Sequence, residues 1–274
     1  MSAPRLWGVF GRPWIDLAPL IDTGGFPALD REFTRGLCEV ATTVTGGSLK
    51  AMGVVAPWQM EDGYRDLMHA VRAMADDELA DLVALADDPA SIDTADREAL
   101  AFGDETDHPL NAAQARLLAV RHGVYFPWKC CFHFVENDRW EDKHAGAGKG
   151  FHPDALRVFP RTVDFIRGLP FREIGRAVLF GLEPNDHAPL HRDTEPGDAL
   201  GVAQSISFAP RRGKRFYLQN REGDPPTIVD APVYWFNDMD RHGVLADPVF
   251  RYSIRVDGVL DPAFVRRVEK LARG

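Results

Sequence analysis

The second half of the chain alternates between short apolar segments and turn-forming residues. The apolar segments are GRAVLFGLEP, GVAQSISFAP, RFYLQN, PVYWFND and FRYSIRVDGV, all between residues 175 and 259. Turn-forming residues separate them at 184–186, 195–198, 211–214 and 223–226. Several short strands in a row, without long helices between them, favour an antiparallel sandwich or barrel.

The first half has a different pattern. Apolar residues at helical spacing between Tyr64 and Asp87 predict one amphipathic helix, or two short helices that meet near Asp76 and Asp77. A further short helix is expected from Asn111 to Arg121. These helices place a mainly helical N-terminal region at residues 1–124.

Residues 125–274 form the second expected region. The aromatic-rich segment 126–136 reads as a strand, and residues 152–169 read as a helix with a break at Pro160. The strands described above follow. We therefore expect an α+β fold, with a β-barrel-like core in residues 125–274 that is buttressed by helices.

Composition limits the classes of protein to consider. The chain has 274 residues and a net charge of −9, so no overall basic balance favours nucleic acid or an anionic membrane. Three cysteines do not suggest a disulfide framework. No apolar run approaches the 18 or so residues that span a bilayer. The expectation is a cytoplasmic protein with no nucleic acid or membrane partner.

One group of polar residues predicts a metal site. His191 and Asp193 form an H-x-D pair, and His242 follows 51 residues after His191, just past the segment PVYWFND. Two histidines and one carboxylate on a β scaffold are typical of the facial triad of non-haem Fe(II) oxygenases, in which three positions stay open. We predict that these three residues bind iron and form the catalytic centre.

A second polar pair follows the last histidine. Arg251 lies nine residues after His242, and Ser253 lies two residues further on. On a strand, these two side chains point to the same face. A guanidinium beside a hydroxyl is a good receptor for a carboxylate, so the pair is expected to bind the far end of a dicarboxylate that chelates the metal.

The combined spacing of H-x-D, a distant histidine and R-x-S resembles the Fe(II)/2-oxoglutarate-dependent oxygenase superfamily. The stretch from Gly175 to Asp257 is most similar to the aspartyl/asparaginyl β-hydroxylase-like group, through GRAVLFGLEP, the FND before His242 and FRYSIRVD. The resemblance implies a double-stranded β-helix, also called a jelly roll or cupin-like core. It also implies Fe(II) as cofactor, with 2-oxoglutarate and dioxygen as co-substrates.

The activity implied is hydroxylation of an unactivated C–H bond in an amino acid or an amino-acid-derived small molecule. Because Asp193 is retained, the halogenating variant of this chemistry is disfavoured. No second basic residue follows H-x-D on the next strand, where Gln204, Ser205 or Ser207 could take its place. A peptide or protein hydroxylase, a desaturase or cyclase, and a non-catalytic jelly-roll protein that binds a ligand or metal remain alternatives.

Three other motifs favour a structural interpretation. His187 lies four residues before His191, the spacing of a helical zinc pair, but Pro189 between them opposes a helix. The segment AGAGKG at 145–150 departs from the phosphate-loop pattern and is expected to be a loop near the site. The segment RRGKR at 211–215 is expected to be a solvated turn.

Overall fold

The computed structural model describes residues 6–40, 54–55, 65–95, 110–125, 129–137, 142–194, 200–211, 215–221 and 223–274. The chain divides into two compact units. One unit joins residues 1–42 to residues 130–274, and the other comprises residues 43–129. In this division the first 42 residues group with the C-terminal part, and the division at residue 125 stays a prediction.

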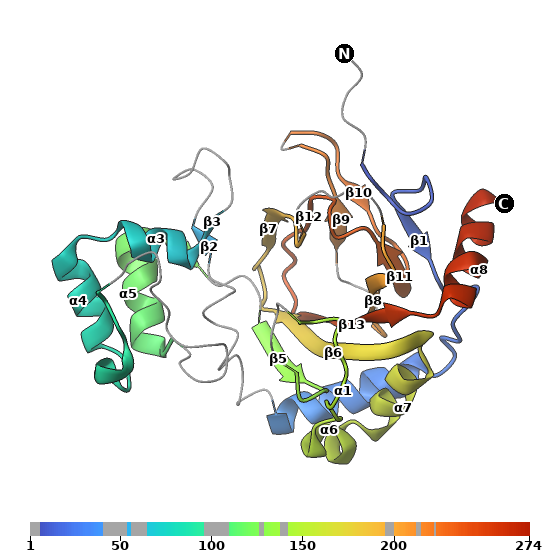
Figure 1. Cartoon of the computed structure of the whole chain (residues 1–274), viewed down its shortest axis with the longest axis horizontal. Coiled ribbons are helices and arrows are strands. Elements are labelled where there is room, and N and C mark those ends of the chain that lie inside the picture. Colours follow the sequence, from blue (N-terminus) through green and yellow to red (C-terminus); the bar gives the residue numbers. More distant parts are fainter. Residues whose placement is uncertain are drawn as a thin grey trace. The chain divides into compact units, whose positions relative to one another are not determined.

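The larger unit contains two sheets (Figure 1). The six-stranded sheet has the order β1-β11-β8-β13-β6-β5, and the four-stranded sheet has the order β10-β9-β12-β7. The strands are β1 (Trp14–Asp16), β5 (Lys129–His133), β6 (Phe171–Leu182), β7 (Ala188–His191), β8 (Ala203–Phe208), β9 (Phe216–Leu218), β10 (Thr227–Ile228), β11 (Val233–Phe236), β12 (His242–Val244) and β13 (Arg251–Leu260). From β6 to β9, and again from β10 to β13, successive strands alternate between the two sheets.

The alternating apolar segments predicted β6, β8, β9, β11 and β13 correctly. The pairings β1–β11, β11–β8, β8–β13 and β13–β6 are antiparallel, as are β10–β9, β9–β12 and β12–β7. This mixture of helices and antiparallel sheets confirms the α+β class. The apolar pattern did not predict β7 and β12, the two strands that carry the histidines, because these strands are short and partly polar.

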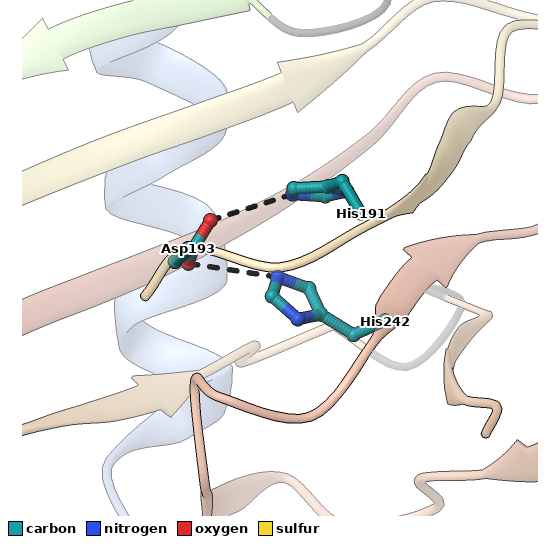
Figure 2. Close-up of side chains that lie close together, drawn as sticks. All are labelled: His191, Asp193 and His242. Atoms are coloured by element: carbon teal, nitrogen blue, oxygen red, sulfur yellow. Dashed lines mark ion pairs between the residues drawn. The ribbon is translucent and has the colours of Figure 1, made fainter. Parts of the chain in front are cut away.

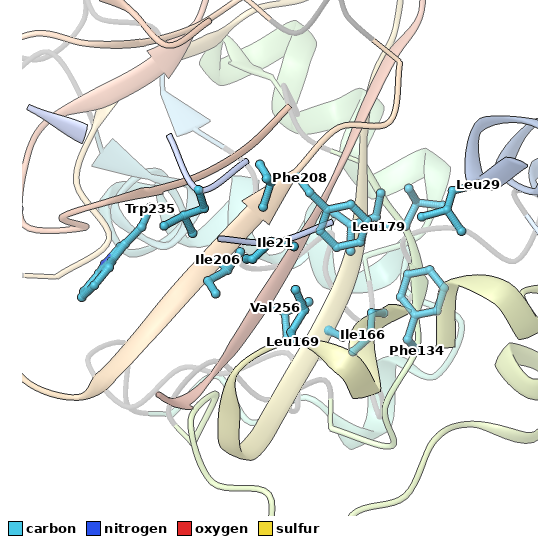
Figure 3. Packing of buried hydrophobic residues seen from close by; sticks show 14 of the residues in the cluster. Ile21, Leu29, Phe134, Ile166, Leu169, Leu179, Ile206, Phe208, Trp235 and Val256 are labelled. Carbon is cyan, nitrogen blue, oxygen red and sulfur yellow. The ribbon is translucent and has the colours of Figure 1, made fainter. Parts of the chain in front are cut away.

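Helices cover one face of the six-stranded sheet. They are α1 (Phe26–Val40), α6 (Pro153–Val158), α7 (Pro160–Gly168) and the C-terminal α8 (Pro262–Arg273). Pro160 separates α6 from α7, as expected. Buried side chains from these helices and from the sheet, including Phe208, Trp235 and Ile166, form one continuous core (Figure 3).

A contact between α1 and α7 closes this layer. The Glu32 carboxylate accepts hydrogen bonds from the backbone N–H groups of Arg161 and Thr162 and from the Thr162 hydroxyl. These are N–H groups of the first turn of α7, which have no partner inside the helix. Glu32 therefore caps α7 from a neighbouring helix and fixes the two helices on the sheet.

The smaller unit is mainly helical within its described residues. It contains β2 (Val54–Val55), β3 (Arg65–Asp66), α3 (Leu67–Ala73), α4 (Asp76–Ala84), the 3-10 turn η3 (Pro89–Ser91), α5 (Ala112–His122) and β4 (Val124–Tyr125). The expected break near Asp76 is confirmed, because α3 ends at Ala73 and α4 begins at Asp76. Asn111 and Gln114 form a capping box at the start of α5.

Among the described helices, none is long and apolar enough to cross a membrane.

Candidate metal and co-substrate site

The three predicted metal ligands lie together between β7 and β12 (Figure 2). His191 ends β7, His242 begins β12, and the two are register partners across the antiparallel pair. His191 Nε2 lies 3.4 Å from Asp193 Oδ1, and His242 Nε2 lies 3.5 Å from Asp193 Oδ2. One ligand atom from each residue falls within 4.8 Å of the others. The strand pairing therefore brings His191 and Asp193 next to His242, which lies 51 residues after His191 in the chain.

The electrostatics of the site favour a charged carboxylate beside neutral imidazole. Burial alone would raise the pKa of Asp193, but the positive charge of Arg255 and the neighbouring His242 lower this pKa well below its usual value. Burial also lowers the pKa of His242. An ionised carboxylate and an unprotonated imidazole are the forms that bind a metal ion.

The ring of His242 is fixed from several sides. Its Nδ1 lies 2.9 Å from the carbonyl oxygen of Asp240, so Nδ1 donates to this carbonyl and Nε2 keeps its lone pair toward Asp193. Phe236 packs edge-on against the ring with centroids 4.8 Å apart, and Phe216 lies at 5.5 Å. A carbonyl that orients a histidine in this way is typical of metal sites in proteins.

The N-terminal segment holds the turn that carries this carbonyl. The Asp240 carboxylate accepts hydrogen bonds of 2.7 Å from the backbone N–H groups of Trp7 and Gly8. Asn237 donates to the Gly8 carbonyl. Gly8 has a φ of +63°, and a Cβ there would lie 2.2 Å from the Arg12 carbonyl oxygen. Only glycine fits this position, so residues 7–12 are shaped to hold the turn before His242.

Asp238 links that turn to the other ligand strand. Its carbonyl accepts hydrogen bonds from the backbone N–H groups of Asp193 and Thr194, and its carboxylate accepts one from the Thr194 hydroxyl. Lys143 Nζ lies 3.3 Å from the same carboxylate. The FND segment therefore has a distinct role at each residue. Phe236 packs on His242, Asn237 binds the N-terminal segment, and Asp238 holds the backbone of the metal-ligand loop.

Arg251 lies on the strand face opposite the helices. Its Nη1 donates to the Leu245 carbonyl, and its Nη2 donates to the Asp186 carbonyl at 2.8 Å. These acceptors continue the two histidine strands, three residues after His242 and five before His191. The Nε of Arg251 is buried and has no hydrogen-bond partner among the described residues. Burial also lowers the pKa of this guanidinium.

Ser253 follows on the same face of β13. Its neighbours in sequence, Tyr252 and Ile254, belong to the apolar core on the other face, so alternation places Ser253 with Arg251. Ser253 is buried. Ser253 thus lies on the same face as Arg251, and the role of this pair as a carboxylate receptor stays a prediction.

A charged network behind the triad was not predicted. Arg255 donates to Asp193 Oδ2 and, through Nε, to Asp257 Oδ1 at 2.7 Å. Asp257 also pairs with Arg176 at 3.0 Å and accepts from the Ser205 hydroxyl. Ser205, one of the β8 residues that could replace a second basic residue in binding 2-oxoglutarate, is thus part of this network. Gln204 lies on the other face, where its side-chain oxygen accepts from Trp235 Nε1.

The remaining motifs have structural explanations. His187 is exposed and precedes a strand, so its spacing to His191 does not form a helical zinc pair. Gly146 N and Ala147 N donate to the Glu173 carboxylate, which anchors the 145–150 loop on β6. Most of the 211–215 turn lies outside the described residues.

The similarity of this chain to the solved structures named here is low. No family model and no curated protein matches the sequence. The chain is similar to a 2OG-Fe(II) oxygenase family oxidoreductase from Burkholderia pseudomallei, with 16% identity, a TM-score of 0.29, and coverage of 46% of this chain and 65% of that one. It is similar to a prolyl-4-hydroxylase from Pseudomonas putida, with 14% identity, a TM-score of 0.25, and coverage of 39% and 64%.

A DMSP lyase from Ruegeria pomeroyi is also similar, with 17% identity, a TM-score of 0.22, and coverage of 30% of this chain and 37% of that one. The chain therefore spans less than two thirds of each of these proteins.

Proposed function

We propose that the chain is an Fe(II)- and 2-oxoglutarate-dependent dioxygenase that hydroxylates an unactivated C–H bond of an amino acid or an amino-acid-derived small molecule. The observation that carries the proposal is the cluster of His191, Asp193 and His242, two imidazoles and one carboxylate with their ligand atoms within 4.8 Å. This donor set suits Fe(II) and leaves coordination positions for other ligands.

The proposed fold is a jelly roll, with β6, β8, β11 and β13 facing β7, β9, β10 and β12. The antiparallel pairing and the distribution of these strands over two sheets support it. In such a core, His191 and His242 lie on adjacent strands of the smaller sheet, and Arg251 begins a strand of the larger one. The proposed iron and co-substrate residues would then face the same interior.

The proposed co-substrate residues fit a dicarboxylate. Arg251 is buried, is held at Nη1 and Nη2 by two carbonyls, and keeps a buried Nε without a partner among the described residues. A carboxylate can accept from such a guanidinium in a charge-assisted hydrogen bond. When bound, iron would supply dioxygen activation coupled to decarboxylation of 2-oxoglutarate. The protein residues would bind, orient and shield the reacting groups.

The metal part of the proposal is tested by anaerobic Fe(II) titration of the purified protein. About one Fe(II) per chain is expected. His191→Ala and His242→Ala should each abolish both tight binding and 2-oxoglutarate turnover, because two remaining ligands hold the metal poorly. His187→Ala is the matched control and should bind like the parent, since His187 is exposed and outside the cluster. Parental iron binding in the His191 or His242 variant would rule out the triad.

The co-substrate part is tested by the affinity for 2-oxoglutarate. Arg251→Ala removes a charge-assisted contact worth about 1.5–3 kcal/mol and should raise the dissociation constant about tenfold or more. Arg251→Lys should recover part of this loss. The control is Arg215→Ala, which removes an exposed positive charge near Arg251 and should change the dissociation constant for 2-oxoglutarate little. An unchanged affinity in Arg251→Ala would contradict the assignment.

Turnover against a panel of amino acids distinguishes the remaining functions. Substrate-dependent conversion of 2-oxoglutarate to succinate, with a product heavier by one oxygen, supports hydroxylation. Loss of two hydrogens from the substrate would instead indicate a desaturase or cyclase. Bound iron without any 2-oxoglutarate consumption would indicate a binding protein.

A further inference from the structure

The two oxygens of the Asp193 carboxylate have different surroundings. Oδ1 lies 3.4 Å from His191 Nε2. Oδ2 lies 3.5 Å from His242 Nε2 and also accepts a hydrogen bond from Arg255 Nη1. One oxygen of this carboxylate is therefore engaged by a guanidinium, and among the described residues the other lies beside the imidazole of His191.

Arg255 is itself held rigidly. Its Nε donates to Asp257 Oδ1 at 2.7 Å, and its Nη2 donates to the Ser205 hydroxyl at 2.9 Å. Nη2 also lies 3.7 Å from the Asp238 carboxylate. The side chains of Arg255, Asp257 and Ser205 are buried. The guanidinium is thus oriented by carboxylate and hydroxyl groups from three separate segments.

The network continues away from the cluster. Asp257 Oδ2 accepts hydrogen bonds from Arg176 Nε and Nη2 at 3.1 and 3.0 Å. Asp257 thus separates two buried arginines: Arg255 donates to Asp193, and Arg176 donates to the other oxygen of Asp257. The chain offers two residues of the same type, with a shared partner, that differ in their contact with the cluster.

We infer that Arg255 is a positioning residue for the metal, which holds Oδ2 of Asp193 and presents Oδ1 to the ion. This inference rests on the proposed function, in which Asp193 is a metal ligand. A carboxylate on a short loop can rotate or bind through both oxygens, and a fixed hydrogen bond to one oxygen limits these choices. Hydrogen-bonded partners of metal ligands commonly act in this way.

An opposing effect has to be weighed. Arg255 carries a positive charge close to a cation site, and it also competes with the metal for the negative charge of Asp193. However, Asp257 and Asp238 also lie against the guanidinium, and together with Arg176 and Lys143 they form a network in which positive and negative charges alternate. Orientation of the ligand is therefore the larger contribution of Arg255, and its removal should weaken metal binding.

The test is anaerobic Fe(II) and Co(II) affinity, measured without substrate or turnover. Arg255→Gln should weaken binding by about 10–100-fold, and Arg255→Lys should restore part of the loss. The matched control is Arg176→Gln, which disturbs the same Asp257 but should keep the metal affinity within about threefold. If Arg255→Gln binds metal as tightly as the parent or more tightly, Arg255 is a competitor for Asp193 and the inference is overturned.

A double-mutant cycle separates positioning from a general structural role. The Asp193→Ala background keeps only the weak two-histidine site, so its residual affinity is titrated with Co(II) at correspondingly higher concentration. In that background, Arg255→Gln should cause no further loss of metal affinity, because there is no carboxylate left to position. An equal loss in both backgrounds would also overturn the inference. If Arg255→Gln does not fold, Arg255→Lys and Ser205→Ala decide the question, since each weakens the hold on Asp193. Parental metal affinity in both of these variants would contradict the positioning role of Arg255.

The failure of the proposed function would look different. In that case, the parent protein would bind no Fe(II), or His191→Ala would bind it as well as the parent does. Loss of binding in His191→Ala together with parental binding in Arg255→Gln would leave the triad in place and remove only the positioning role.

Discussion

The two faces of the six-stranded sheet differ sharply, although the same strands build both. On β13, Tyr252, Ile254 and Val256 join the apolar core beneath the helices. The intervening residues Arg251, Ser253, Arg255 and Asp257 are also buried, but they make ion pairs and hydrogen bonds. Burial alone therefore does not distinguish a core face from a site face. The difference lies in whether the buried groups need specific partners.

The two faces should also fail in different ways. On the apolar face, each side chain adds an increment of burial and packing, and the loss on substitution depends on the cavity that remains. On the charged face, the attraction between ions mainly offsets the cost of removing them from water. Removal of one ion leaves its partner buried and unpaired. For the same number of atoms removed, a substitution on the charged face should therefore lower the free energy of unfolding more than a substitution on the apolar face does.

The largest expected effect follows from Asp257. Asp257→Ala would leave Arg176 and Arg255 without their shared carboxylate, and breaking a buried pair in this way costs about 3–5 kcal/mol. The free energy of unfolding, measured in urea, should fall by this amount. Asp257→Asn keeps the shape and some hydrogen bonds, so its loss should be smaller. Parental stability in Asp257→Ala would show that the two arginines are solvated and that the charged face is not closed.

A smaller effect is expected on the apolar face. Ile254 is fully buried in the core, and Ile254→Ala should lower the free energy of unfolding by about 2–4 kcal/mol. The iron affinity of the folded variant should stay at the parental value, because Ile254 points away from the cluster. Ile254→Val is the milder control and should lower the free energy of unfolding by about 0.5–1.5 kcal/mol. A clear loss of iron affinity in the valine variant would show that the two faces are not independent.

The same contrast explains what the sequence could predict. Alternation of apolar residues and turn residues was enough to find β6, β8 and β13, because these strands bury one apolar face. The short strands β7 and β12 contain histidine, proline or glycine and carry no such pattern. They could be inferred only through the spacing of His191 and His242.

The charged network lay beyond the reach of sequence reasoning. Arg255 and Asp193 are 62 residues apart, and the link between them depends on which strands pair. Likewise, the contact of Gly8 with Asp240 spans 232 positions. Pattern and spacing indicate which residue types occur on a strand, whereas the partner of a buried charge is set by the three-dimensional pairing.

The smallest expected effect concerns pH and His133, which lies on β5 beside the charged face. Burial, with a further contribution from the positive charge of Arg176, lowers the pKa of His133 to about 4. In the unfolded chain this pKa is about 6.5. Between these values the unfolded state binds more protons than the folded state, so stability falls as the pH decreases from about 6.5 to about 4.

The difference between the two pKa values of His133 corresponds to at most about 3 kcal/mol of unfolding free energy. Because the residue is only partly buried, we expect the free energy of unfolding to fall by about 1–2 kcal/mol. His133→Gln cannot take up this proton and should therefore lose less stability than the parent between pH 7 and pH 4.5. His187→Gln, which changes an exposed histidine outside the charged face, is the matched control for the loss of a histidine. Urea denaturation at the two pH values measures the difference. Parallel curves for the parent and His133→Gln would show that His133 titrates alike in both states, and that the charged face does not extend to β5.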